Sequence, residues 1–140
     1  MKYHQLGNSG LQVSAVGLGT NNFGHRLDVA ATALVVGQAL DVGINMIDTS
    51  NNYGGNGGSE EFIGKALKGR RPGAIIATKV SSRMAEGPNN AGNSRAHIMA
   101  EVENSLRRLD TDYIDLYQIH WFDPDTPIEE TLRALDDLVR

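Results

Sequence analysis

Short apolar runs alternate with amphipathic segments along most of the chain. The apolar runs predict strands, because a few consecutive apolar residues bounded by turn residues are typical of buried strands. The segments between them repeat apolar residues three or four positions apart, which is the period of a helix. The pattern predicts strands at residues 15–19, 46–48, 74–79 and 113–120.

Helix boundaries are marked by residues that suit them. Asp28, Ser59 and Ser94 are candidate N-caps for helices over residues 28–41, residues 60–68 and a third segment that ends near residue 109. Residues 126–129 (TPIE) resemble a capping box with a proline at the first helical position. The expected apolar stripes are Ile98, Val102, Leu106 and Leu109 in the third helix, and Ile128, Leu132, Leu135 and Val139 in the fourth.

The order of these elements predicts an α/β fold. A hairpin over residues 1–14, turning at residues 7–10, precedes four strand–helix units over residues 15–140. Alternating strands and helices predict a parallel sheet, either an open doubly wound sheet or part of a (β/α)8 TIM barrel. A full barrel needs eight units, so residues 1–140 would be the N-terminal half of one.

Composition narrows the class of protein. The net charge is −4, from 13 basic and 17 acidic residues, so neither nucleic acid nor an anionic membrane is an expected partner. There is no cysteine, which excludes disulfides and thiolate–metal sites. No apolar run is long enough to cross a membrane, and residues 1–5 lack the apolar segment of a signal peptide. We therefore expect a cytoplasmic protein.

Three of the predicted strands end in an ionisable residue. Asp48, Lys79 and His120 occupy these positions, and Tyr53 follows five residues after Asp48. Ligands of parallel α/β folds bind at the carboxyl ends of the strands, so these four side chains are expected at one rim.

This combination of groups suits the delivery of a proton. An ammonium next to a phenol favours the phenolate and makes a phenol a stronger acid. Asp48 would hold Lys79 in its charged form, Tyr53 would be the acid, and His120 would orient a carbonyl oxygen or relay the proton. No side chain donates hydride, so carbonyl reduction would require a nicotinamide or flavin cofactor.

Other interpretations explain less of the pattern. Alone, each of the four residues is as readily a cap, a solvated charge or a packing residue. A metal hydrolase would use His120 with Asp48, but no second strand-end histidine is present and Lys79 would repel a cation, so no metal site is expected. Residues 17–19 lack the third glycine of a dinucleotide fingerprint, and residues 54–58 are not followed by the Lys-Ser/Thr of a P-loop.

Several segments together resemble the aldo-keto reductase family. The resemblance covers nearly the whole chain. Its segments are 17–20 (GLGT), 43–54 (GINMIDTSNNYG), 58–60 (GSE), 64–67 (GKAL), 77–79 (ATK) and 106–121 (LRRLDTDYIDLYQIHW).

The resemblance implies an NAD(P)H-dependent oxidoreductase on a (β/α)8 barrel, acting on small carbonyl substrates. It implies that Tyr53 is the proton donor and that Asp48, Lys79 and His120 complete a catalytic tetrad. Thr20, Asn21 and Asp48 would contact the nicotinamide end of NADPH or NADH. Separately from the resemblance, the position of Trp121 directly after His120 suggests that it lines the substrate pocket, with a packing role as the alternative. The rest of the family's cofactor site lies on strands five to eight, which have no counterpart here.

Two hypotheses follow. In the first, the chain is a carbonyl reductase with Tyr53 as its acid. In the second, it is a catalytically incompetent, truncated half-barrel that self-associates as a scaffold or fragment, because open strand edges and apolar residues such as Ile114 and Leu116 would be exposed.

Overall fold

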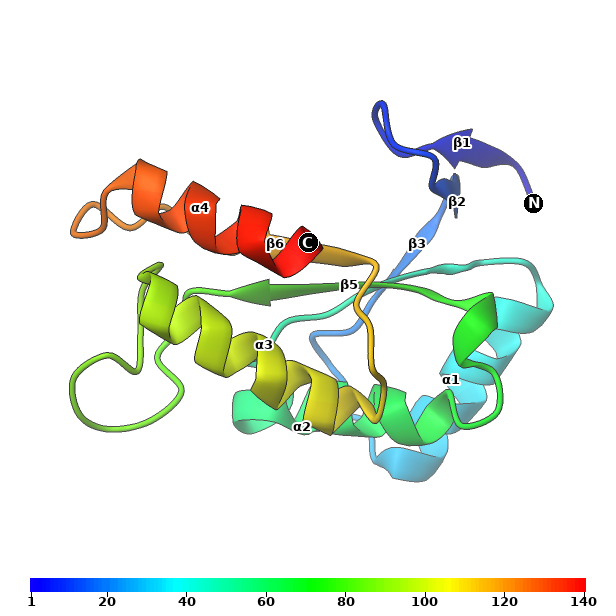
Figure 1. Ribbon diagram of the computed structural model, residues 1–140. Helices are drawn as coiled ribbons and strands as arrows, with labels where there is room; N and C mark the ends of the chain where they lie inside the picture. Colours follow the sequence, from blue (N-terminus) through cyan, green and yellow to red (C-terminus); the bar gives the residue numbers. More distant parts are fainter.

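The computed structural model describes residues 1–140 and contains two separate sheets (Figure 1). A parallel sheet has the strand order β3-β4-β5-β6, and an antiparallel hairpin pairs β1 with β2. The strands are β1 (Tyr3–Gln5), β2 (Gln12–Ser14), β3 (Gly17–Gly19), β4 (Met46–Asp48), β5 (Ile75–Val80) and β6 (Leu116–Ile119). The helices are α1 (Val29–Asp41), α2 (Tyr53–Ala66), α3 (Arg95–Leu109) and α4 (Ile128–Val139), with a short 3-10 turn, η1 (Arg71–Gly73).

Sequential parallel pairing is the arrangement expected for consecutive strand–helix units of a barrel. The four predicted strand–helix units are present, although the fourth strand is shorter than predicted and begins at Leu116. The register pairs Gly19 with Asp48, Asp48 with Ala77, and Lys79 with Gln118. Each strand therefore ends close to the end of its neighbour, and the carboxyl ends form one rim.

The hairpin attaches to the opposite, amino end of the sheet. Its Tyr3 hydroxyl donates a 2.9 Å hydrogen bond to the carbonyl of Gly43, just before β4. The side chain of Asn45 accepts from the backbone NH of Ser14 at 2.7 Å and donates to the carbonyl of Gln12 at 3.0 Å. These bonds satisfy the edge of β2 and place the hairpin away from the rim that carries Asp48.

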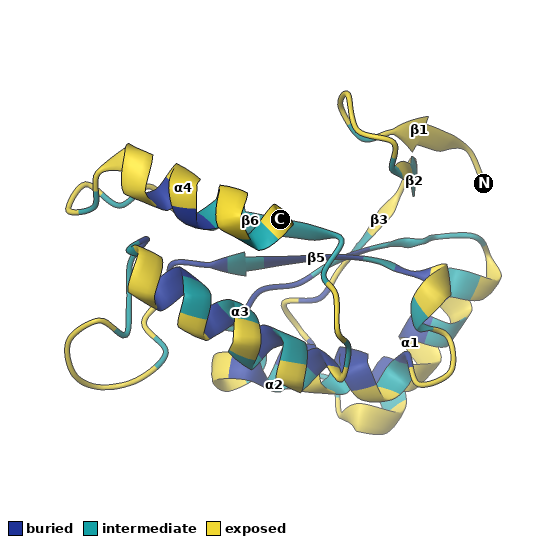
Figure 2. Ribbon diagram, in the orientation of Figure 1, coloured by how far each residue is buried: buried dark blue, intermediate teal, exposed yellow.

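Successive helices pack against one another along one side of the sheet, α1 on α2, α2 on α3 and α3 on α4. Beneath them lies the main apolar core, and Figure 2 shows its buried residues on the sheet and the inner helix faces. The fully buried members of this core include Val36, Ile47, Ile63 and Ile76. A smaller core, which contains Val80, Ile98 and Ala134, joins β5 to α3 and α4.

Two of the predicted caps are confirmed and two are wrong. Asp28 accepts from the backbone NH of Ala31 at 2.8 Å, and Ser94 accepts from that of His97 at 3.3 Å. Ser59 lies inside α2 and its hydroxyl bonds elsewhere. The hydroxyl of Thr126 donates to Asp123 at 2.7 Å, so it caps nothing, and α4 begins after Pro127 without a side-chain cap.

The first turn of α2 is irregular. Four consecutive residues have positive φ: Gly54, Gly55, Asn56 and Gly57. A Cβ at Gly54 would lie 2.5 Å from the carbonyl oxygen of Phe23 and 2.6 Å from the backbone nitrogen of Ser59. Only glycine fits both this conformation and this close approach, so the glycine-rich segment is a tight turn that follows Tyr53 directly.

Only two of the four apolar residues that were predicted to line the buried face of α3 are fully buried. Ile98 and Leu109 are buried as expected, but Val102 and Leu106 are half-buried and line an apolar groove toward α4. The remaining buried positions of α3 are polar and include Glu101 and Ser105. Apolar periodicity alone does not identify this buried face of α3, because the face contains charged residues whose partners lie inside the protein.

A buried ion cluster explains why α3 turns polar residues inward. Arg108 donates from Nε to Glu60 at 2.6 Å and from Nη2 to Glu101 at 3.3 Å. Glu60 is fully buried and also accepts from the hydroxyl of Thr78 at 2.5 Å, while Glu101 accepts from the side chain of Asn51 at 3.0 Å. The cluster ties α2, α3, β5 and the segment after β4 together.

The fourth helix differs from its predicted orientation. Thr131 and Ala134 are its buried residues, whereas the predicted stripe residues Ile128 and Leu132 are exposed. Leu135 is half-buried. The helix thus packs only one edge of its apolar face on β5 and β6. None of the helices is long and apolar enough to span a membrane.

We expect the substitution Arg108→Met to lower the free energy of unfolding by about 3–5 kcal/mol, because it leaves the buried Glu60 carboxylate without its partner. Arg107→Met is the matched control, since the neighbouring Arg107 side chain is 68% exposed and should change stability by less than about 0.5 kcal/mol. Urea unfolding of both variants measures the difference. Equal losses would show that the cluster is not a stabilising unit.

Candidate active site

Lys79 and Asp48 form an ion pair at the carboxyl rim. The Lys79 ammonium lies 2.8 Å and 2.9 Å from the two oxygens of Asp48 and donates to the carbonyl of Thr49 at 2.7 Å. The Lys79 side chain is 13% exposed and that of Asp48 is 41% exposed. The ammonium is thus fixed by two partners, while the carboxylate remains open to a ligand at the rim.

Tyr53 lies against this ion pair. The Lys79 ammonium is 5.2 Å from the centre of the Tyr53 ring. Tyr53 begins α2, and its backbone NH donates to the carbonyl of Ser50 at 3.2 Å. The turn between β4 and α2 therefore brings the phenol back over the strand ends, as the sequence predicted for its position.

His120 completes the group from the end of β6. Its ring meets the Tyr53 ring edge-on, with centroids 5.8 Å apart, and stacks on Trp121 at 3.7 Å. Burial lowers the pKa of His120 below its ordinary value, the charge of Lys79 lowers it further, and Asp48 opposes this. This shift favours the neutral form of the ring. Trp121 is 53% exposed and covers one face of the imidazole.

The segment between β4 and α2 is held from below by groups that sequence reasoning missed. Thr49, Ser50 and Asn51 are fully buried. Asn51 bonds to Glu101 through its side chain and donates from its backbone NH to the carbonyl of Lys79 at 3.2 Å. Ser50 lies 3.1 Å from Nδ1 of His120. The sequence does show three consecutive polar residues directly after a buried strand, and this pattern could have identified them as part of the site.

Of the predicted cofactor residues, Thr20 lies beneath the rim. Its hydroxyl donates to the carbonyl of Asp48 at 2.9 Å and accepts from Ser59 at 3.0 Å, and the residue is 1% exposed. Its role here is to join β3, β4 and α2. Asn21, the next residue, is exposed, so Asn21 and Asp48 are the predicted residues with polar groups open to a ligand.

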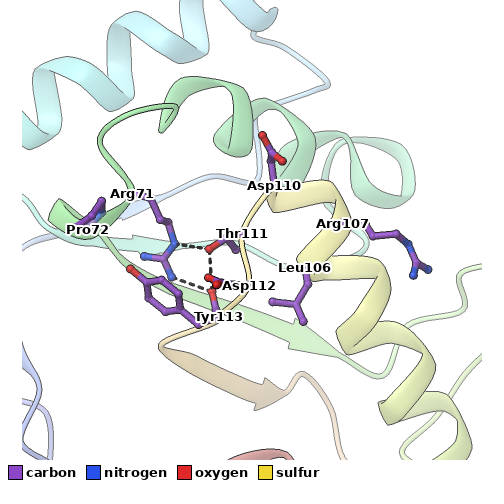
Figure 3. A pocket seen from close by; sticks show the side chains of 8 residues that line it. All are labelled: Arg71, Pro72, Leu106, Arg107, Asp110, Thr111, Asp112 and Tyr113. Carbon is purple, nitrogen blue, oxygen red and sulfur yellow. Dashed lines mark hydrogen bonds between the residues drawn. The ribbon is translucent and has the colours of Figure 1, made fainter.

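A hollow of about 660 Å³ lies at the other end of the sheet (Figure 3). There Arg71 donates to Asp115 at 2.8 Å and to the carbonyl of Tyr113 at 2.9 Å, and its guanidinium stacks 3.8 Å from the centre of the Tyr113 ring. These residues precede β5 and β6. The amino end of a barrel sheet carries stabilising contacts, and all three side-chain nitrogens of Arg71 already donate to protein groups, so this hollow is not assigned to a ligand.

The arrangement at the carboxyl rim is suited to proton transfer. A phenol, a fixed ammonium and an imidazole converge without any acidic cluster that would hold a metal ion. A positive charge beside a phenol stabilises the phenolate that remains when the proton leaves. The site therefore has the elements of a general acid directed at a ligand above the strand ends.

Comparisons with known proteins identify the family of the chain. Residues 15–140 match the family model described as Aldo/keto reductase family. Aldo-keto reductase YhdN of Bacillus subtilis is 44% identical, and L-glyceraldehyde 3-phosphate reductase of Escherichia coli is 38% identical. Aldo-keto reductase AKR11C1 from Bacillus halodurans, solved in its holo form, superposes with a TM-score of 0.89 at 45% identity.

These matches cover 99–100% of this chain but only 43%, 42% and 46% of the respective relatives. The chain thus spans less than half the length of the proteins it matches, and its four-stranded sheet corresponds to part of their barrel. Family members are oxidoreductases that generally use NAD(P)H. With a family model that matches nearly the whole chain and a matching fold, the chain belongs to the aldo/keto reductase family.

Proposed function

We propose that this chain carries the proton-transfer half of an NAD(P)H-dependent oxidoreductase that reduces aldehyde or ketone carbonyls to alcohols. The observation that carries the proposal is the contact of Lys79 with both Asp48 and the Tyr53 ring. Residues 1–140 are proposed to be the N-terminal half of the barrel, with a hairpin over residues 1–14. A soluble, cytoplasmic location is consistent with this reaction.

In the proposed reaction Tyr53 donates its hydroxyl proton to the carbonyl oxygen as the oxygen gains negative charge. Lys79 stabilises the phenolate that remains, and its position is fixed by Asp48 and by the carbonyl of Thr49. His120 positions the substrate oxygen beside Tyr53. Trp121 is proposed to line the substrate pocket, because it is half exposed and stacks on the His120 ring.

The residues at the rim fit the nicotinamide end of NADPH or NADH. A nicotinamide supplies the hydride that no side chain can provide. The partly exposed Asp48 carboxylate and the exposed amide of Asn21 are proposed to bind the carboxamide of the ring, whereas the buried Thr20 supports Asp48 from below. The donor set suits a polar, uncharged group better than a metal ion, because Lys79 lies at its centre.

We expect the substitution Tyr53→Phe to lower kcat for NADPH-dependent aldehyde reduction by about 10²–10⁴-fold, the typical contribution of a positioned general acid. Tyr113→Phe removes a hydroxyl from an exposed ring on the opposite end of the sheet and should retain the activity of the unsubstituted chain. Steady-state kinetics with a small aldehyde measure both. Full turnover by Tyr53→Phe would refute the assignment.

We also propose, as the second candidate, that the chain self-associates through the open side of its sheet. Ile128, Leu132 and Val139 project exposed apolar side chains along α4, and β6 has no strand beyond it. An unpaired strand next to an apolar helix face favours pairing with another chain. A second copy placed there would extend the sheet beyond β6.

Sedimentation velocity tests this second candidate. We expect the unsubstituted chain to sediment as a dimer or larger species, and Leu132→Ser to shift it toward the monomer because Leu132 is 57% exposed on the apolar face. Glu129→Ser changes an exposed polar residue of the same helix and should leave the distribution unchanged. A sharp monomer for the unsubstituted chain would contradict the proposal.

A further inference from the structure

Ser50 has three polar neighbours, and their chemistry constrains its hydroxyl proton. Its Oγ lies 2.8 Å from Oδ1 of Asn52, 3.1 Å from Nδ1 of His120 and, more distantly, 3.5 Å from Oδ1 of Asn51. The residue is fully buried, so water does not compete for these contacts. A hydroxyl has one proton to donate, and an amide oxygen can only accept. Ser50 therefore donates to Asn52 and can offer only a lone pair to His120.

The lone pair of Ser50 determines the state of the imidazole. A neutral histidine carries its proton on one of two nitrogens, and the hydrogen bond of one nitrogen fixes the state of the other. Nδ1 facing an acceptor must carry the proton. No protein group hydrogen-bonds Nε2, so nothing stabilises the opposite tautomer.

We infer that Ser50 is a positioning residue that holds the proton of the neutral His120 ring on Nδ1, so that Nε2 is a hydrogen-bond acceptor at the rim. The neutral ring then cannot donate to a carbonyl oxygen. It donates from Nε2 only when the ring is charged. His120 would thus orient a carbonyl in its charged form and accept a hydroxyl proton in its neutral form.

The charged groups around the ring determine when this change occurs. Lys79 on β5 opposes protonation of His120, Asp48 on β4 favours it, and Tyr53 on α2 meets the ring through its edge. Burial and the charge of Lys79 together lower the pKa of His120, which favours the neutral acceptor form. This part of the inference, unlike the tautomer itself, rests on the proposed function.

Nitrogen NMR of the full chain without cofactor tests the tautomer directly. The ¹⁵N signals of the His120 ring are recorded at about pH 8, above the ordinary histidine pKa of about 6.5, and are assigned by their loss in His120→Gln. We expect a pyrrole-type signal for Nδ1 and a pyridine-type signal for Nε2. The reverse pattern would overturn the inference, whether or not the chain reduces carbonyls.

Three variants distinguish an effect of the Ser50 hydroxyl on the tautomer from an effect of altered packing. Ser50→Ala should convert the single form into a mixture of tautomers. Asn52→Asp should keep the proton on Nδ1, because a carboxylate can only accept from Ser50. Ser81→Ala is the matched control, since Ser81 accepts from the backbone NH of His120 at 3.2 Å and makes no hydrogen bond with the ring nitrogens. An equal change in Ser81→Ala would assign the effect to packing and overturn the inference.

The pH profile of carbonyl reduction gives an independent readout of the functional part. We expect kcat/KM of the unsubstituted chain to fall as pH rises through the pKa of His120, because the neutral ring cannot donate from Nε2. Ser50→Ala should flatten this fall, since its neutral ring can carry the proton on Nε2. A profile unchanged by Ser50→Ala, with the tautomer altered, would refute the role in the reaction and leave the tautomer assignment intact.

Discussion

The register of the parallel sheet is the constraint on which the rest of this structure depends. It aligns the ends of β4 and β5 so that Asp48 and Lys79 meet within 2.8 Å. A shift of one residue would turn each side chain to the other face of the sheet and separate this pair. The same register leaves His120 just beyond the end of β6, beside Tyr53. The rim is thus a consequence of strand pairing.

Behind the rim, buried polar contacts hold the turn that carries Tyr53. Asn51 connects this turn to Glu101, and Arg108 connects Glu101 to Glu60 on α2. Two carboxylates share one guanidinium in this cluster, so its geometry must be exact for its burial to be tolerated. The polar inner faces of α2 and α3 therefore serve the site, and the apolar core beside them supplies the packing.

The sequence predicted the order of elements and the position of the site because both depend on local patterns. The strand ending at Asp48 matches its prediction to the residue, and the caps Asp28 and Ser94 have the geometry expected of them. The predicted strand ends indicated Asp48, Lys79 and His120, with Tyr53 nearby, and the family resemblance suggested their roles. The structure brings the four side chains together.

Elements that depend on tertiary partners were less predictable. Ser59 was expected to cap a helix, but its hydroxyl is used to join Thr20 and Thr49. In the sequence, Glu60 and Glu101 resemble surface residues, because only the folded structure shows Arg108 beside them. The apolar side of α4 was predicted to be buried, yet Ile128, Leu132 and Val139 are exposed.

The central claim is that this rim binds the nicotinamide end of a cofactor. Titration of the chain with NADPH, followed by the fluorescence of the reduced nicotinamide, tests it most directly. The account predicts saturable binding with a Kd in the micromolar range, about −8 kcal/mol. It also predicts weaker binding when Asp48 is replaced by alanine. No saturation at concentrations up to about 1 mM, where the binding free energy would be weaker than about −4 kcal/mol, would contradict the claim.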